Sequence, residues 1–138
     1  MSDLVRFTVS IERSLFEKLE KQVADSDYRN RSEFVRDLVR GYLVEQDWQS
    51  EKVLLGTISL LYDHHTRGLS EKLTHRQHHF PGQVLATTHI HLDEHNCLEV
   101  IILKGSASQV EKIAHELITT RNVKHGQLIK TTTGTDIP

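Results

Sequence analysis

Residues 75–104 read HRQHHFPGQVLATTHIHLDEHNCLEVIILK, and the rest of the chain is organised around this stretch. It holds six of the ten histidines and the only cysteine. Residues 83–92 and 97–104 are apolar or alternating runs separated by a short polar segment, a pattern typical of two strands of a hairpin. We therefore expect a β-hairpin that carries a concentrated set of reactive side chains.

The alternation of side chains along a strand predicts which of them lie together. One face of the first strand carries Leu85, Thr87, His89 and His91, and its other face carries Val84, Ala86, Thr88, Ile90 and Leu92. If His91 pairs with Cys97 across the loop, then His89 pairs with Glu99 and all four point the same way. A slip of one residue would turn Cys97 to the opposite face, so this hypothesis depends on the register.

Two imidazoles and a thiolate are ligands that suit a borderline transition metal such as nickel, copper or zinc. Calcium and magnesium would favour oxygen ligands instead. Glu99 is better suited to supporting a histidine than to binding the ion. The hairpin alone lacks a fourth ligand, and the nearest histidine-rich segment is 77–79. Three further histidines are candidates for weak auxiliary sites: His64, His75 and His79.

The segments around the hairpin predict a complete second domain over residues 52–132. An apolar strand is expected first, then a helix, the hairpin, another helix and a last strand. Their predicted ranges are 53–62, 66–79, 83–92, 97–104, 106–120 and 124–132. The order β-α-β-β-α-β is the ferredoxin-like arrangement, so the expected fold class is α+β.

The sequence of residues 1–48 indicates a smaller domain of a different kind. Residues 4–11 alternate apolar and polar side chains, which is typical of a strand. Two amphipathic helices follow, over 13–25 and from a cap at Asn30 onward. The strand has no neighbour to pair with in the sequence, and the simplest partner is the same strand of a second chain.

The polar face of that strand carries Arg6, Thr8 and Ser10. Arginine suits the acceptor edge of guanine, and hydroxyl groups adapt to several bases. The formal net charge is −2, so contacts to DNA must come from a local patch and not from a global field. There is no apolar segment of membrane-spanning length, and we expect a soluble, cytoplasmic protein without a membrane partner.

Strand, helix, turn and helix resemble the ribbon-helix-helix DNA-binding fold, with YRNRSEFVRD at 28–37 as the characteristic segment. Together with the run THIHLDEHNCLEVIILKG at 88–105, the chain resembles the nickel-responsive transcriptional repressor family. The resemblance implies an intermolecular ribbon in the major groove of double-stranded operator DNA. It also implies an ACT-like regulatory domain and a homotetramer built as a dimer of dimers.

The resemblance further implies one Ni(II) per subunit, held by His89, His91 and Cys97 of one chain and His78 of a neighbouring chain. Three imidazoles and a thiolate in a plane suit nickel, whereas zinc prefers a tetrahedron, and Cu(II) or Zn(II) are the expected competitors. In some members two acidic positions, here Glu33 and Asp37, bind a second cation.

The chain departs from the family pattern after His79. Phe80 and Pro81 follow, where some members continue with more histidines, and this bears on auxiliary sites but not on His78.

Two other functions fit part of the pattern. A zinc hydrolase could use the same hairpin with an open coordination position and Glu99 as base, but the unpaired strand at 4–11 would then have no purpose. A ribbon-helix-helix regulator that responds to another ligand explains the architecture but not the histidine and cysteine set. We therefore expect a regulator and not an enzyme.

Overall fold

The computed structural model describes residues 3–138 and divides into two compact units. One unit contains the residues up to 43 together with 137–138, and the other spans Val44–Asp136. The boundary lies within a helix, because α2 (Arg31–Asp47) continues for several residues past it. Each unit is described below by itself.

The first unit holds α1 (Arg13–Ala24) and most of α2. The Asn30 side chain accepts the backbone N–H of Glu33 at 3.0 Å, which caps α2 as its sequence predicts. The Glu33 carboxylate reaches back to the N–H of Arg29 at 3.2 Å and not to that of Asn30. Residues 3–12 form neither helix nor strand within this one chain, so pairing of the segment 4–11 with a second chain stays a prediction.

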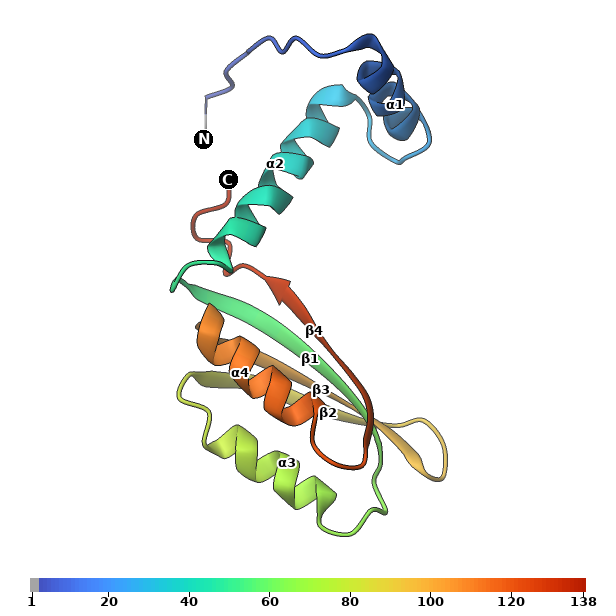
Figure 1. The fold of residues 1–138 in the computed structure, drawn as a ribbon, viewed down its shortest axis with the longest axis vertical. Coiled ribbons are helices and arrows are strands. Elements are labelled where there is room, and N and C mark those ends of the chain that lie inside the picture. Colours follow the sequence, from blue (N-terminus) through green and yellow to red (C-terminus); the bar gives the residue numbers. More distant parts are fainter. Residues whose placement is uncertain (1–2) are drawn as a thin grey trace. The chain divides into compact units, whose positions relative to one another are not determined.

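The second unit contains a four-stranded antiparallel sheet and two helices (Figure 1). In chain order they are β1 (Val53–Asp63), α3 (Leu69–His78), β2 (Gln83–His91), β3 (Asn96–Ser106), α4 (Ala107–Ile118) and β4 (Val123–Thr131). The strand order is β2-β3-β1-β4. The element order and topology confirm the α+β, ferredoxin-like arrangement.

Both helices cover one face of the sheet (Figure 1), and the core lies between the two layers. Alternate residues of β1 and β3 point into it and are buried, as the period of two requires. The core also contains Leu73 of α3, Leu117 of α4 and Trp48. The indole N–H of Trp48 donates a hydrogen bond to the carbonyl of Thr131 at 3.0 Å.

The other face of the sheet carries apolar side chains that no element of residues 44–136 covers. Ile90 of β2 is 44% exposed, and several neighbours on β1 and β3 are half-buried. They are Leu55, Leu61, Leu98, Val100 and Ile102. An apolar surface of this kind is typical of a contact between subunits.

Strand β2 differs from its prediction at one point. Its pairing with β3 shifts between Val84 and Ala86, a bulge that leaves Leu85 without a partner. Val84 therefore lies opposite Leu103 on the covered face, packed against the core, and its predicted position on the other face with Ala86 is wrong.

No helix in residues 3–138 is both long enough and apolar enough to cross a membrane.

Candidate metal centre

The β2–β3 hairpin has the register that the metal hypothesis requires. His91 lies opposite Cys97, and His89 lies opposite Glu99. Cys97 and Glu99 belong to the buried series of β3, so all four side chains project from the face that α3 and α4 cover. The prediction of this register from the alternating pattern is confirmed.

Asp93 holds the hairpin loop in place. One of its carboxylate oxygens accepts the backbone N–H groups of His95 at 2.9 Å and Asn96 at 2.7 Å. The other oxygen accepts the side-chain amide of Asn96 at 2.9 Å. These hydrogen bonds lower the pKa of Asp93 to about 2, and the bond from the Asn96 side chain contributes most. The sequence contained this signal as an aspartate three residues before an asparagine, but our prediction did not use it.

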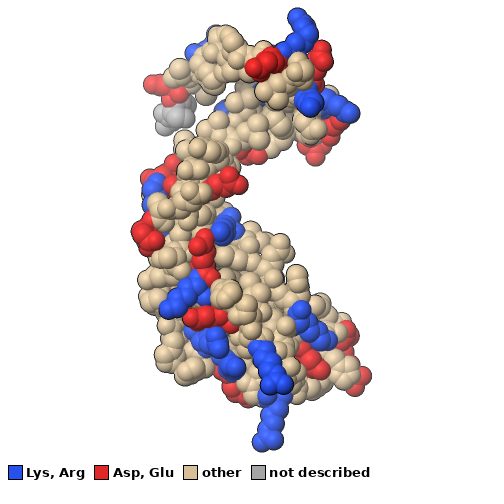
Figure 2. All heavy atoms as spheres, viewed as in Figure 1, with Lys and Arg blue, Asp and Glu red and all other residues tan. Residues whose placement is uncertain are grey.

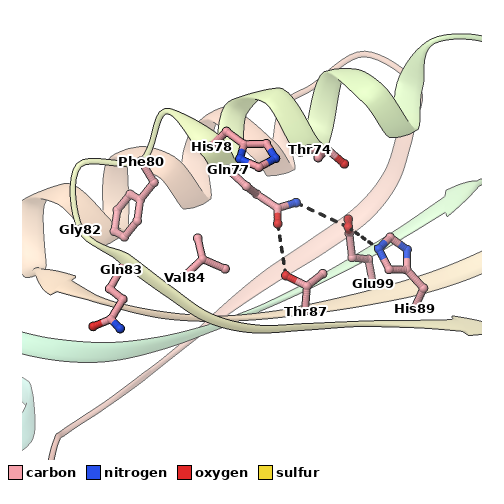
Figure 3. Close-up of a pocket in the computed structure, with 10 residues that line it drawn as sticks. All are labelled: Thr74, Gln77, His78, Phe80, Gly82, Gln83, Val84, Thr87, His89 and Glu99. Atoms are coloured by element: carbon pink, nitrogen blue, oxygen red, sulfur yellow. Dashed lines mark hydrogen bonds and ion pairs between the residues drawn. The ribbon is translucent and has the colours of Figure 1, made fainter.

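Glu99 is a carboxylate that is only 1% exposed and is surrounded by polar groups (Figure 3). Its Oε1 atom lies 3.0 Å from Nε2 of His89 and 3.5 Å from the side-chain nitrogen of Gln77. Its Oε2 atom accepts the Tyr62 hydroxyl at 3.4 Å, and burial beside this carboxylate raises the pKa of Tyr62. The position of Glu99 fits its predicted supporting role, and Gln77 and Tyr62 are additional partners that the sequence did not indicate.

Cys97 is buried at 2% exposure and forms no disulfide. Burial raises the pKa of its thiol, and the neighbouring Glu99 carboxylate adds to this effect. The thiol is therefore protonated at neutral pH in the chain alone. A metal ion that binds here must displace this proton, because thiolate is the ligand form of cysteine.

A cavity of about 510 Å³ lies between α3 and β2 (Figure 3). His78, Gln77 and Thr74 of α3 line one side of it, and Thr87 and His89 of β2 line the other. His78 is exposed in the last turn of α3. His78 thus opens onto the same cavity as His89 of its own chain, whereas the predicted fourth ligand is the His78 of a neighbouring chain.

The predicted ligand atoms do not converge on one point in the single chain. Within residues 3–138, Asp63, His65 and His95 are the one group of three potential ligands whose atoms all lie within 4.8 Å of one another. His89 is turned toward Glu99 instead. Such a separation is compatible with a site that a second chain completes.

The three candidate auxiliary histidines lie in two places. The ring of His64 contacts that of His91 edge-on, with centroids 4.5 Å apart. The rings of His75 and His79 lie one turn apart at the end of α3, tilted by 43° to each other, with centroids 4.2 Å apart.

The predicted DNA-contacting residues Arg6, Thr8 and Ser10 are all exposed. Over the surface drawn in Figure 2, basic and acidic side chains are interspersed, in agreement with the absence of a global positive field. The two predicted second-cation residues, Glu33 and Asp37, are one turn apart on α2. Asp37 accepts a hydrogen bond from the Tyr28 hydroxyl.

Comparisons with known proteins agree with this architecture. Residues 5–46 match the model of the ribbon-helix-helix proteins of the copG family. Residues 55–131 match the model of the NikR C-terminal nickel-binding domain. These two matches define a transcriptional regulator with a separate metal-binding domain, and not an enzyme.

Full-length relatives identify the particular family. The chain is 46% identical to a protein of Geotalea uraniireducens and 47% identical to one of Geobacter metallireducens, and each match covers 99% of both chains. A protein of Solibacter usitatus is 48% identical over the same share. All three are provisionally named as nickel-responsive regulators. The chain belongs to the nickel-responsive regulator family.

Proposed function

We propose that this protein is a repressor whose binding to operator DNA is switched on by Ni(II). The observation that carries the proposal is the pairing of His91 with Cys97, because it places two imidazoles and a thiol on one face of one hairpin. This ligand set suits nickel, copper or zinc. The family and the names of the relatives favour nickel among them.

The proposed site holds one nickel ion per subunit through His89, His91 and Cys97 of one chain and His78 of a neighbouring chain. The residues present fit such an ion. Nε2 of His89 is engaged by the buried Glu99, which leaves Nδ1 available for the metal. When bound, nickel supplies the bridge that joins the hairpin of one chain to α3 of the next.

The assembly that we propose is a homotetramer, a dimer of dimers with an ACT-like core formed by residues 52–132. The uncovered apolar face of the sheet, which includes Ile90 and Val100, supports this assembly because a second copy would bury it. Residues 1–48 form the DNA-binding domain in the same proposal, and residues 1–2 of that range lie outside the described part of the chain.

DNA is bound by a ribbon formed from residues 4–11 of two chains. Arg6, Thr8 and Ser10 then face the bases, and Phe7 and Val9, which are exposed at 73% and 62% in the single chain, are covered by the helices of the dimer. Glu33 and Asp37 form the proposed second cation site. A protein that binds operator DNA works where the DNA is, so we place it in the cytoplasm.

Nickel can favour DNA binding only by binding one arrangement of the four chains better than another. The contact between α3 of one chain and the hairpin of a neighbouring chain is what differs between the two arrangements. By reciprocity, operator DNA must tighten nickel binding by the same factor.

The deciding experiment is selection of bound duplexes from a random-sequence DNA library, with and without added Ni(II). We expect one operator sequence to be enriched only with Ni(II), and this enrichment to disappear in Cys97→Ala. His115→Ala, which removes an exposed histidine of α4, should behave as the wild type. Equal enrichment without metal would contradict the proposal and favour a regulator that responds to another ligand.

A second measurement addresses the metal itself. Ni(II) titration should produce a thiolate-to-nickel charge-transfer band that Cys97→Ala abolishes, and Cu(II) or Zn(II) should compete for the site. Arg6→Ala should lose operator binding while nickel stoichiometry stays unchanged, and Arg13→Ala is its matched control at the start of α1. Loss of nickel binding in Arg6→Ala would show that the two functions are not in separate units.

A further inference from the structure

The last turn of α3, which carries His78, is followed at once by an apolar residue that lies in the core. Phe80 is two positions beyond His78 and is only 7% exposed. Its side chain is directed from the end of α3 toward the sheet (Figure 3). His78 itself is exposed, so the position of its imidazole depends on how firmly the backbone of this turn is held.

Two glycines leave the space that the ring of Phe80 occupies. A Cβ atom on Gly82 would lie 2.6 Å from Cε1 of Phe80, and one on Gly105 would lie 3.0 Å from its Cζ atom. Carbon atoms pack best about 3.5 to 4.0 Å apart, so a larger residue at either position would displace the ring. Gly82 precedes β2 and Gly105 lies near the end of β3. The ring therefore fixes α3 to the open end of the β2–β3 hairpin.

The connection between Phe80 and His78 is short and hydrogen-bonded. The N–H of Phe80 donates to the carbonyl of Gln77 at 3.2 Å, and the N–H of His79 donates to that of His75 at 3.3 Å. These bonds use carbonyl groups that the helix end would otherwise leave without a partner. A ring that is held in the core thus restrains the residue two positions before it.

The polar contacts of this turn hold it less firmly. The side-chain nitrogen of Gln77 lies 3.5 Å from Glu99, and its oxygen accepts the Thr87 hydroxyl at 3.3 Å. Both distances are longer than those of a typical hydrogen bond. Phe80 lines the cavity of about 510 Å³ described above and also a second one of about 480 Å³ between α3 and α4. A smaller residue at position 80 would admit water beneath the last turn of α3.

We infer that Phe80 is a positioning residue for the nickel site. It keeps the last turn of α3 folded in the metal-free protein, so that His78 is ready to complete the site of a neighbouring chain. This inference rests on the proposed function, because His78 is the fourth ligand there. The apparent nickel affinity equals the intrinsic affinity multiplied by the fraction of chains in which the turn is folded. An apolar contact that never touches the ion thereby sets how tightly the ion is bound.

The first measurement is amide hydrogen exchange in the metal-free, full-length protein. In the wild type, the amides of residues 75–79 should be protected. In Phe80→Ala they should exchange at least about tenfold faster relative to the amides of α4. Leu128→Ala is the matched control, because it removes an apolar side chain from the same core on β4, at the opposite edge of the sheet from β2. It should not single out α3. Unprotected amides at 75–79 in the wild type would overturn the inference.

The second measurement is Ni(II) affinity by calorimetry. Phe80→Ala should bind Ni(II) at least about tenfold more weakly than the wild type, whereas Leu128→Ala should bind it equally well. Phe80→Leu keeps an apolar side chain and should retain most of the affinity. Gly105→Ala leaves Phe80 intact but crowds its ring, so it should weaken binding in the same direction, by less than Phe80→Ala does. Wild-type affinity in both Phe80→Ala and Gly105→Ala would overturn the inference.

The thiolate charge-transfer band separates failure of this inference from failure of the proposed function. If the wild type shows the band and Phe80→Ala binds Ni(II) equally well, the inference fails while the proposed function stands. If the wild type binds Ni(II) without the band, the proposed function fails, and the role of Phe80 in nickel binding fails with it.

Discussion

The two units of this chain differ in where their apolar side chains lie. In residues 44–136, a sheet and two helices enclose a core in which Ile58, Leu73 and Leu117 have no exposed surface. In residues 3–43, not one residue is buried. Leu38 and Tyr42 of α2 are 57% and 60% exposed, although α2 has a clear apolar stripe.

This difference shows that one unit contains its own core, whereas the apolar side chains of the other stay exposed in the single chain. Two short helices and one extended segment cannot enclose an apolar interior, because about 40 residues offer too little surface to bury. The second unit has enough layers to do so. Its open sheet face and the exposed apolar side chains of the first unit are the surfaces that the proposed assembly would cover.

The largest effect is expected in the core of the second unit. Leu117→Ala should lower the free energy of unfolding by about 2–5 kcal/mol, because it leaves a cavity beneath α4. The fluorescence of Trp48 reports on this core, since it is the only tryptophan and is buried there. A loss of less than about 1 kcal/mol would mean that the core rearranges to fill the space.

The next effect tests the first unit. Leu38→Ala should lower its stability by about 1.5–3 kcal/mol, but only if a second chain buries that side chain. The thermal midpoint of the helical circular dichroism signal should then rise with protein concentration. Lys18→Ala on α1 is the exposed control, with an expected change within about 0.5 kcal/mol. A concentration-independent midpoint and equal effects of both variants would show that this unit is stable as a monomer.

A smaller effect concerns the polar group within the second core. Glu99→Gln keeps the size of the side chain but removes the charge that faces His89 and Tyr62. Nickel affinity, measured by calorimetry, should fall about 10- to 100-fold. Glu71→Gln, an exposed position on α3, should leave it unchanged. If both variants bind nickel equally well, Glu99 contributes to the stability of the fold and not to nickel binding.

The smallest effect is at the hairpin loop. Since the pKa of Asp93 is lowered to about 2 in the folded chain, its contribution to stability is present above its unfolded value of about 3.9 and is lost as the pH falls toward 2. Titration of the Asp93 carboxyl by NMR should give a midpoint near 2, and Asp93→Ala should speed amide exchange at Asn96. A midpoint near 4 would contradict the hydrogen-bonded loop.

Local patterns were sufficient for much of the fold and for part of the candidate site. Alternation along 83–92 and the position of Cys97 predicted the register that pairs His91 with Cys97, and this is confirmed. The same alternation failed at Val84, because a bulge at Leu85 adds one residue to the strand and reverses the faces before it. The assignment of the four nickel ligands and the three DNA-contacting residues stays a prediction.

The sequence by itself determined the order of helices and strands from residue 13 onward and the common face of His89, His91 and Cys97, because these follow from periodicity and spacing along the chain. The family followed from the resemblance of its motifs. Only the tertiary structure decided which groups surround that face. Gln77 and Tyr62 reach Glu99 from positions 22 and 37 residues away, and Asp63 meets His95 across the ends of two strands. Such contacts depend on how the strands pair and on how α3 packs on the sheet, and no local pattern encodes that arrangement.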